Sequence, residues 1–339
     1  MKNTIGPVLC LSALLVVAGC SSGGGTTITT TPAANPGASS AYVSNQTPSG
    51  TQTDPQILGY SATSSTSAQT SMVNGPLTDT FLGLTTDSSG NLYTVDKSGT
   101  NGTYMLNEYA AGTTSSGITA SATMRTFTST AITAAPAAVR VDPSGNVYVM
   151  LTGGTVLRFA ASSTESVSPT ASLSITGGGT IATDSGNNLY VTVPVSATDT
   201  HQAIAVYTSG YASGAVAART ILPATEMFIT SLAVDASGNI YATGKDANGN
   251  IEVAVFAATA TGTSTATRVI TGANTSLVNP WQVQVDSAGN IFVADSTSGS
   301  VGSSVMMYKF AASATGNVAP TLKIASSATY SATSAMTVF

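Results

Sequence analysis

Residues 232–243 read LAVDASGNIYAT, in which an alternating apolar run meets an aspartate and, six residues later, an aromatic opens a second alternating run. A period of two predicts a strand on each side, and Asp, Gly and Asn are residues that tight turns favour. Four more copies keep the same spacing: LTTDSSGNLYTV from Leu84, VRVDPSGNVYVM from Val139, IATDSGNNLYVT from Ile181 and VQVDSAGNIFVA from Val283. Five hairpins at a regular period indicate a repeat architecture, either a propeller or a solenoid.

Each copy is followed by two further apolar runs. The third run ends in an aromatic before small residues, as in residues 255–258 (VFAA), and the fourth follows a connection rich in Gly, Ser and Thr, as in residues 268–270 (RVI). Four short alternating strands in an up-and-down order predict one antiparallel blade. The four are named strands A to D, in chain order from the first run of each copy.

The two ends of the chain complement each other. Residues 41–44 match strand B, residues 59–62 match the end of strand C and residues 71–75 match strand D, but no strand A precedes them. The chain ends in TSAMTVF, residues 333–339, which is similar to the strand A beginning TSLAV at Thr230. We therefore predict an all-β fold, a six-bladed β-propeller with four antiparallel strands per blade, closed by the C-terminal strand A pairing with N-terminal strands B to D.

The first 20 residues carry a targeting pattern. Lys2, a short apolar run from Val8 to Ala18 and the small residues before Cys20 predict a signal peptide over residues 1–19, too short to span a membrane. The segment resembles a bacterial lipoprotein signal, and the resemblance implies that Cys20 becomes a lipidated N-terminus. Ser21, which is not Asp, then favours the outer membrane over the inner membrane of the cell envelope. The alternative is an ordinary signal peptide with an incidental cysteine.

The remaining chain divides into a tether and a folded domain. Residues 20–40 comprise the cysteine to be lipidated and a stretch rich in Gly, Ser, Thr and Pro with no apolar period, which is typical of a flexible tether. Residues 41–339 form the predicted propeller. We cannot expect a disulfide, because Cys10 lies in the segment to be removed and Cys20 is the only other cysteine.

Composition excludes several classes of function. Charged residues make up 7% of the chain, the formal net charge is -5 and no basic run occurs, so binding of nucleic acid through its phosphates is not expected. A single histidine excludes a histidine-rich zinc site, and no motif around His201 would build a Ser-His-Asp triad. No catalytic residue is therefore assigned.

Two repeated features have a plain structural interpretation beside a functional one. The Asp-x-x-Gly-Asn turn offers oxygen ligands for calcium, but we favour aspartates that accept hydrogen bonds from the turn backbone. The loop from Asp246 begins like a calcium loop and has Ala257 where an EF-hand needs glutamate. The aromatics that open strand B and close strand C are expected between the blades rather than on a platform for sugars or bases.

Candidate ligand-binding residues gather in the D-to-A and B-to-C connections, which share the face that propellers use for ligands. Loops on a rigid scaffold are where binding groups usually lie, although a protein with few charges also places them on its loops. Arg140, in strand A, could pair with Asp87 or Asp184 of adjacent blades or bind an anionic ligand. The candidate residues are Asp79, Asp96, Arg140, His201, Glu226, Phe228, Lys245, Trp281 and Asp295.

The unit xVDxxGNIYVA followed by VxVF resembles the NHL-type propeller repeat over residues 41–339, with 42 to 55 residues between successive turn aspartates. The resemblance implies a non-catalytic binding or scaffold module, for which we expect an unknown protein or saccharide ligand and no cofactor. Together with the lipoprotein signal, it predicts that this module is lipid-anchored. The alternative, implied by related six-bladed lactonases and lyases, is a metal-dependent hydrolase or lyase. It would hold Ca²⁺ or Mg²⁺ at the channel mouth, with Glu226, Asp79 and Asp295 as ligands. A third hypothesis is a purely structural surface protein.

Overall fold

The computed structural model describes residues 40–45, 56–63, 69–74, 80–98, 102–110, 123–196, 198–199, 201–298, 300, 303–329 and 335–338. The chain divides into two units, Met1–Ala34 and Asn35–Phe339, and all described residues belong to the second. Cys20 and Asp79 lie outside the described residues, as do the predicted signal peptide and most of the tether. None of the helical segments in the described ranges has the length and apolar character that crossing a membrane requires.

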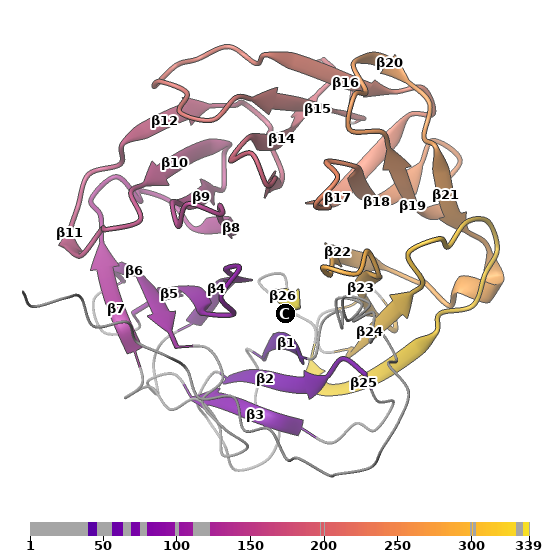
Figure 1. Ribbon diagram of the computed structural model, residues 1–339, viewed down its shortest axis with the longest axis horizontal. Helices are drawn as coiled ribbons and strands as arrows, with labels where there is room; N and C mark the ends of the chain where they lie inside the picture. The colour runs from indigo at the N-terminus through magenta and orange to yellow at the C-terminus, as the bar shows by residue number, and fades with distance from the viewer. Residues whose placement is uncertain are drawn as a thin grey trace, which may run out of the picture. The chain divides into compact units, whose positions relative to one another are not determined.

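Six antiparallel sheets are arranged around a central axis, with strand A of each sheet innermost (Figure 1). Each strand A contacts the strand A on either side, so the six form a closed circuit. In order around the ring they are β4 (Thr80–Thr86), β8 (Pro136–Val141), β13 (Ile181–Thr183), β17 (Met227–Val234), β22 (Pro280–Val285) and β26 (Met336–Val338). The predicted six-bladed propeller is confirmed, and blades 1 to 6 are numbered in this order.

Strands B, C and D continue each blade outward. The strands B are β5 (Leu92–Lys97), β9 (Val147–Leu151), β14 (Leu189–Pro194), β18 (Ile240–Asp246), β23 (Ile291–Ser296) and β1 (Ser40–Asn45). The strands C are β6 (Tyr104–Tyr109), β10 (Thr155–Phe159), β15 (Gln202–Tyr207), β19 (Ile251–Phe256), β24 (Ser304–Phe310) and β2 (Gln56–Ser61). The strands D are β7 (Thr123–Thr128), β12 (Ala171–Ser174), β16 (Arg219–Pro223), β21 (Arg268–Thr271), β25 (Leu322–Thr329) and β3 (Gln69–Asn74).

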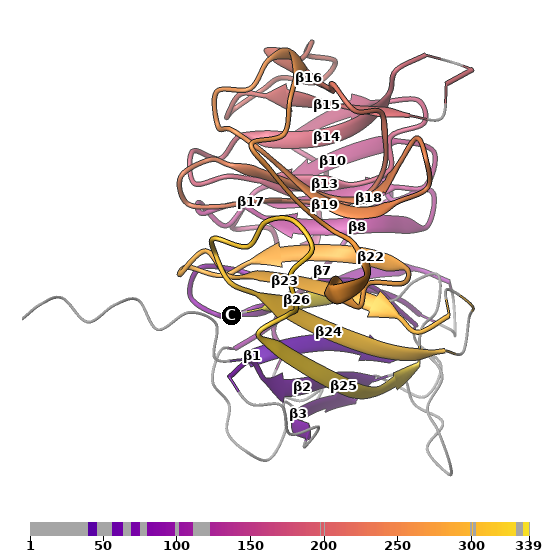
Figure 2. The same cartoon turned by 90° about the vertical axis from the view of Figure 1, so that its right-hand side faces the viewer.

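Blade 6 is shared between the two ends of the chain. β26 pairs antiparallel with β1, with Ala41 opposite Val338 and Val43 opposite Met336, and the two strands lie side by side in Figures 1 and 2. The backbone N–H of Ser44 also donates to the carbonyl oxygen of Ala335 at 2.9 Å. The predicted closure is therefore confirmed, and it leaves no unpaired strand at the seam.

Two blades carry a short fifth strand that the apolar pattern does not predict. β11 (Glu165–Ser166) and β20 (Gly262–Ser264) lie in C-to-D connections, and each pairs in parallel with the strand D of the preceding blade, β7 and β16 respectively. These segments are polar and have no alternation, so periodicity cannot reveal them. They cover outer sheet edges that would otherwise be open to pairing with other chains.

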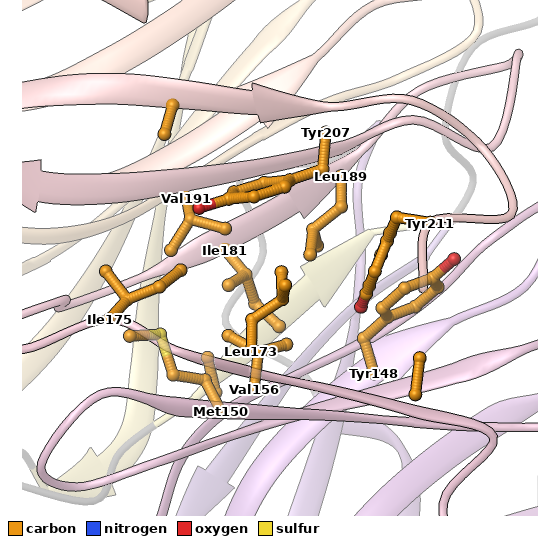
Figure 3. Packing of buried hydrophobic residues seen from close by; sticks show 13 residues of the cluster. Tyr148, Met150, Val156, Leu173, Ile175, Ile181, Leu189, Val191, Tyr207 and Tyr211 are labelled. Atoms are coloured by element: carbon orange, nitrogen blue, oxygen red, sulfur yellow. The ribbon is translucent and has the colours of Figure 1, made fainter. Parts of the chain in front are cut away.

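The core lies between neighbouring blades. In one cluster, Tyr148 and Met150 of blade 2 pack against Ile181, Leu189 and Val191 of blade 3 (Figure 3). The repeated aromatics are part of such clusters, which confirms their predicted place between the blades and leaves no aromatic platform there. Both rings are buried, with Tyr42 partly so: Tyr42, Tyr93, Tyr148, Tyr190, Tyr241 and Phe292 in one, Tyr60, Tyr109, Phe159, Tyr207, Phe256 and Phe310 in the other.

The aspartate of each A-to-B turn accepts several hydrogen bonds from its own hairpin. Oδ1 of Asp235 accepts the backbone N–H groups of Ser237 and Asn239, both at 2.9 Å. Oδ2 accepts Nδ2–H of Asn239 at 2.9 Å and the hydroxyl of Tyr241 at 3.0 Å. The turn interpretation is confirmed, because both carboxylate oxygens are already used by donors of the protein itself.

One position of the turn requires a left-handed backbone. It is the third residue after the aspartate. In the turn that begins at Asp235 this residue is Gly238, with a φ of 82°. In the turn that begins at Asp184 the glycine is displaced by one residue, and Asn187 takes the position with a φ of 61°. Asparagine tolerates this region better than other residues with a side chain. The turn is therefore preserved although the sequence motif shifts.

Candidate functional site

Three cavities lie along the axis of the ring, and neighbouring cavities share lining residues; together they are called the axial channel. The first has a volume of about 440 Å³ and lies at the end where the strands A start. All six blades contribute to its wall, as Leu82, Ala138, Thr180, Ser231, Gln282 and Ala335 show. The strands A of blades 1, 2, 4 and 5 have a register shift at this level. Such bulges occur at the rims of closed sheets, and here they shape the mouth.

Two more cavities continue the channel toward the A-to-B turns. The first has a volume of about 110 Å³ and is lined by side chains at one register position of the strands A: Thr85, Arg140, Ala182, Ala233 and Gln284. The last has a volume of about 290 Å³ and opens among four turn aspartates, Asp87, Asp142, Asp184 and Asp235. The channel therefore has a mouth whose described residues include no carboxylate, a narrow middle section and an acidic far mouth.

Arg140 lies at the junction of the mouth cavity and the middle section. The residue is only 8% exposed, and its Nη1 donates to the carbonyl oxygen of Val139 at 2.7 Å. Among the described residues, no Asp or Glu oxygen lies within 4.0 Å of its guanidinium nitrogens. Burial lowers the pKa of Arg140 from 12.5 to about 10, so the guanidinium still carries its charge at neutral pH.

The expected ion pair of Arg140 with Asp87 or Asp184 does not form, because both carboxylates are held by their own turns. Asp184 accepts the backbone N–H groups of Gly186 and Asn188 at 2.9 and 2.8 Å, and Asp87 is bonded in the same way. The other alternative, an anionic ligand, therefore remains for Arg140.

The arginines of the strands D have a different role. Arg125, Arg219 and Arg268 each donate to carbonyl oxygens in the C-to-D connection of the next blade. Arg125 also pairs with Glu108 at 2.7 Å. These guanidinium groups fasten neighbouring blades together, whereas Arg140 bonds only to the backbone beside it among the described residues.

Two neutral side chains in the channel wall have polar atoms without a hydrogen-bond partner among the described residues. They are Oγ of Ser231, in the mouth cavity, and Nε2 of Gln284, in the middle section. By contrast, the amide of Gln282 bonds to both the N–H and the carbonyl of Met336, at 2.7 and 2.5 Å. The sequence pattern does not single out Ser231 and Gln284, because a neutral polar residue in a strand carries no signal of its own.

Four candidate residues come together at the rim of blades 3 and 4, where the B-to-C connection of blade 3 meets the start of strand A of blade 4. Nδ1 of His201 lies 2.8 Å from Oδ1 of Asp199 and 3.3 Å from Oε2 of Glu226. The ring of Phe228, which is 41% exposed, lies with its centroid 4.8 Å from that of His201. Lys245 is exposed and opposite Phe228 in the strand register.

Asp199, His201 and Glu226 offer three ligand atoms that all lie within 4.8 Å of one another. One imidazole between two carboxylates can hold a divalent cation. Of the three ligands expected for a metal-dependent enzyme, Glu226 belongs to this cluster, and Asp79 lies outside the described residues.

Asp295, the third expected ligand, is in the interior, and so is Asp96. Both are only 1% exposed. Asp295 accepts the backbone N–H groups of Val278 and Asn279 at 2.7 and 2.6 Å, and it fixes the connection that leads into β22. Burial raises the pKa of Asp295, although these hydrogen bonds oppose the shift. Asp96 accepts Nδ2–H of Asn107 at 2.5 Å inside blade 1.

Trp281, the last candidate, lines the mouth cavity together with Arg140. The structure thus separates the candidates into a channel pair, Trp281 and Arg140, a rim cluster around His201, and two buried carboxylates. These are features of a closed six-bladed β-propeller with an axial channel in which Arg140 carries the only charge among the described residues of the mouth cavity.

Comparisons with known proteins show similarity at the level of the fold. No family model matches the chain, and no curated protein matches it in sequence. The WD40 domain of Toxoplasma gondii coronin is similar with a TM-score of 0.48 and 12% identity, over 84% of this chain and 68% of that chain. A protein of unknown function from Bacteroides caccae has a TM-score of 0.46 and 10% identity, over 65% and 76%. The Cps50 (Swd1) propeller of Myceliophteria thermophila has a TM-score of 0.44 and 10% identity, over 73% and 88%.

Proposed function

We propose that the protein is a lipid-anchored binding module of the bacterial cell envelope, which holds its ligand in the axial channel and performs no catalysis. The observation that carries the proposal is the mouth cavity, whose volume of about 440 Å³ lies within the range of ligand pockets. Its wall is built from strands fixed by their neighbours on both sides, and such a wall presents a preformed site. The resemblance to NHL repeats implies a protein or saccharide ligand, and the cavity itself is also large enough for other small molecules.

The N-terminal sequence supports the anchor. Cys20 follows a short apolar segment and small residues, and about 20 residues of tether separate it from the propeller. The repeats resemble the NHL type, which is consistent with a scaffold for binding.

A channel-filling variant tests the binding proposal. Ala137 is exposed in the mouth cavity, so Ala137→Phe should obstruct the channel without disturbing the core. We expect a panel of saccharides, short peptides and small organic acids to contain compounds that raise the melting temperature of the natural protein. Those increases should disappear in Ala137→Phe and persist in Val216→Phe, which changes a residue that is 88% exposed outside the channel. Increases that are equal in all three proteins would refute a ligand site in the channel.

The two cysteines test the anchor. With Cys20→Ala, we expect the protein to leave the membrane fraction of cells and to lose incorporation of labelled fatty acid. Cys10→Ala, inside the segment to be removed, should change neither result. Membrane association that survives Cys20→Ala would overturn the anchor and leave the channel proposal intact.

The rim cluster supports a second candidate function, a metal-dependent hydrolase or lyase. Asp199, His201 and Glu226 could hold the cation, with Ca²⁺ or Mg²⁺ as the expected metal. Because an imidazole nitrogen also suits Zn²⁺, all three ions should be tried. His201 is the only histidine, so in untagged protein its NMR signals report on this site alone. If the metal ions shift the NMR signals of His201 saturably, and these shifts are lost in Glu226→Gln, the result would favour the metal-dependent enzyme. Signals of His201 that none of the ions changes would reject this second function.

A further inference from the structure

Among the basic residues that the structure describes, Arg140 is the one whose surroundings do not explain why it is buried. A guanidinium in the interior is costly unless a counter-charge and further hydrogen bonds compensate for its lost hydration. Among the described residues, the guanidinium of Arg140 makes one hydrogen bond, to the carbonyl oxygen of Val139. No carboxylate among these residues pairs with its charge. The charge faces a cavity rather than a core, so a bound anion can supply the missing partner.

Two further hydrogen-bond donors in the wall of the channel could also bind an anion. Nε2 of Gln284 lines the middle section with Arg140, and Oγ of Ser231 lines the mouth cavity with it. Both atoms are buried and have no partner among the described residues. Gln284 is on blade 5 and Arg140 on blade 2, so the two occupy opposite sides of the ring. A carboxylate accepts two parallel bonds from one guanidinium and has lone pairs left for further donors.

The two ends of the channel differ in a way that gives the ligand a direction. Four aspartates surround the far mouth, and their negative charges oppose the approach of an anion from that side. The near mouth offers Ala137, which is exposed, and Trp281, which is partly exposed, and both side chains are apolar. An anion with an apolar body can therefore enter by the near mouth, with its charged end leading.

We propose, on the basis of the channel function above, that the ligand is a small monocarboxylate with an apolar body, whose carboxylate binds Arg140 and whose body lies along Ala137 and Trp281. The natural compound belongs to this chemical class. One fixed positive charge matches the single negative charge of a carboxylate, which favours this class over phosphate esters.

Trp281 is the only tryptophan in the chain, so its fluorescence reports on the mouth cavity alone. Hexanoate, hexanol and hexylammonium have the same apolar chain and differ in charge, and inorganic phosphate has charge without the chain. We expect hexanoate to change the fluorescence of Trp281 saturably with one site, and the other three probes to bind at least about tenfold more weakly. Equal binding of hexanol would overturn the carboxylate assignment while leaving a channel ligand in place. If none of the four probes binds and no compound of the wider panel raises the melting temperature, both the channel site and the carboxylate assignment would be overturned.

Variants separate the charge of Arg140 from other effects. Arg140→Met should weaken hexanoate by about tenfold to a hundredfold, and Arg140→Lys should weaken it less, because lysine keeps the charge and loses the two-bond geometry. Arg158→Ala removes the same charge from strand C of the same blade and should leave hexanoate binding unchanged. Binding to Arg140→Met that equals that of the natural protein would refute the proposal.

A stability measurement distinguishes a ligand-binding arginine from a structural one. Without ligand, Arg140→Met removes a buried charge that lacks a counter-ion, so we expect its melting temperature to equal or exceed that of the natural protein. Hexanoate should then raise the melting temperature of the natural protein alone. A large loss of stability in ligand-free Arg140→Met and in Arg140→Lys would show that Arg140 supports the fold instead.

Discussion

At the scale of single residues, the same side-chain type has different roles because its surroundings differ. Both carboxylate oxygens of the turn aspartate Asp235 accept hydrogen bonds from its own hairpin, whereas Oδ1 of Asp199 lies beside the imidazole of His201 on the rim. Arg268 bonds to the next blade, and Arg140 faces the channel. Residue type alone therefore defines what a group can do, and its partners decide what it does.

Two glycines of blade 4 allow backbone strain to be separated from crowding. Gly238 and Gly249 have φ values of 82° and 81°, but a Cβ at residue 238 would meet Cβ of Ala258 at 3.1 Å, and one at residue 249 would meet nothing within 4 Å. Gly249→Ala should lose about 1 kcal/mol from the left-handed backbone, and Gly238→Ala roughly 1 kcal/mol more from the contact. Urea unfolding at neutral pH measures both values. Equal losses of unfolding free energy in the two variants would show that Ala258 can move away from the new Cβ at no measurable cost.

At the scale of elements, the A-to-B hairpin is a unit that one sequence motif defines. Its aspartate binds the turn backbone, the following asparagine and the tyrosine that opens strand B. The fifth copy has Phe292 in place of tyrosine, and there Nζ of Lys309 lies 4.0 Å from Oδ2 of Asp286. The hairpin keeps its shape because the backbone bonds of the aspartate do not depend on the aromatic.

The tyrosines of these hairpins predict a loss of stability in alkali. Burial, followed by the nearby charge of Asp184 or Asp235, raises the pKa of Tyr190 and of Tyr241 from 10.0 to about 12. Their contribution is complete below pH 10, where both states are protonated. It is lost as pH rises from 10 to 12, because the unfolded chain releases the proton first.

The measurement is the free energy of unfolding by urea from pH 8 to pH 12. Tyr241→Phe should be less stable at pH 8 by about 1 kcal/mol, because Asp235 loses a donor, and should fall less steeply above pH 10. Comparison with the natural protein at each pH cancels the other groups that titrate in this range. Parallel curves for the two proteins would contradict the predicted ionisation.

At the scale of the whole molecule, closure of the ring depends on a strand of three residues. Met336–Val338 pairs with β1 and contacts β4 and β22, so it joins three blades. Without it, β1 would present an open edge to the channel and to other chains. The six strands A also create the channel, so closure and the proposed site depend on the same contacts.

Removal of the last strand tests the importance of closure. Deletion of residues 335–339 should lower the melting temperature by roughly 10 °C or more and promote aggregation, because buried side chains and a sheet edge become exposed. A synthetic peptide with the sequence of residues 333–339 should restore much of the loss by adding a strand to β1. A peptide with Met336 and Val338 changed to Asp is the matched control. A truncated protein as stable as the full chain would contradict the role of the seam.

The candidate site was less predictable than the fold. Arg140 and Trp281 were expected on a ligand face and lie in the channel wall, and His201, Glu226, Phe228 and Lys245 lie together on the rim. Asp96 and Asp295 look alike as loop carboxylates in the sequence, yet they are buried among backbone and amide donors. Their burial depends on where neighbouring connections fold, and periodicity does not describe that.

The sequence by itself determined the hairpins, the number of blades and the closure between the two chain ends. These follow from short-range alternation and from turn chemistry, both repeated at a regular period, so each copy supports the reading of the others. Only the tertiary structure decided that Arg140 has no carboxylate partner among the described residues and that Ser231 and Gln284 share its channel. These residues belong to different blades, and the distance between their side chains is set by how the ring closes rather than by their spacing along the chain.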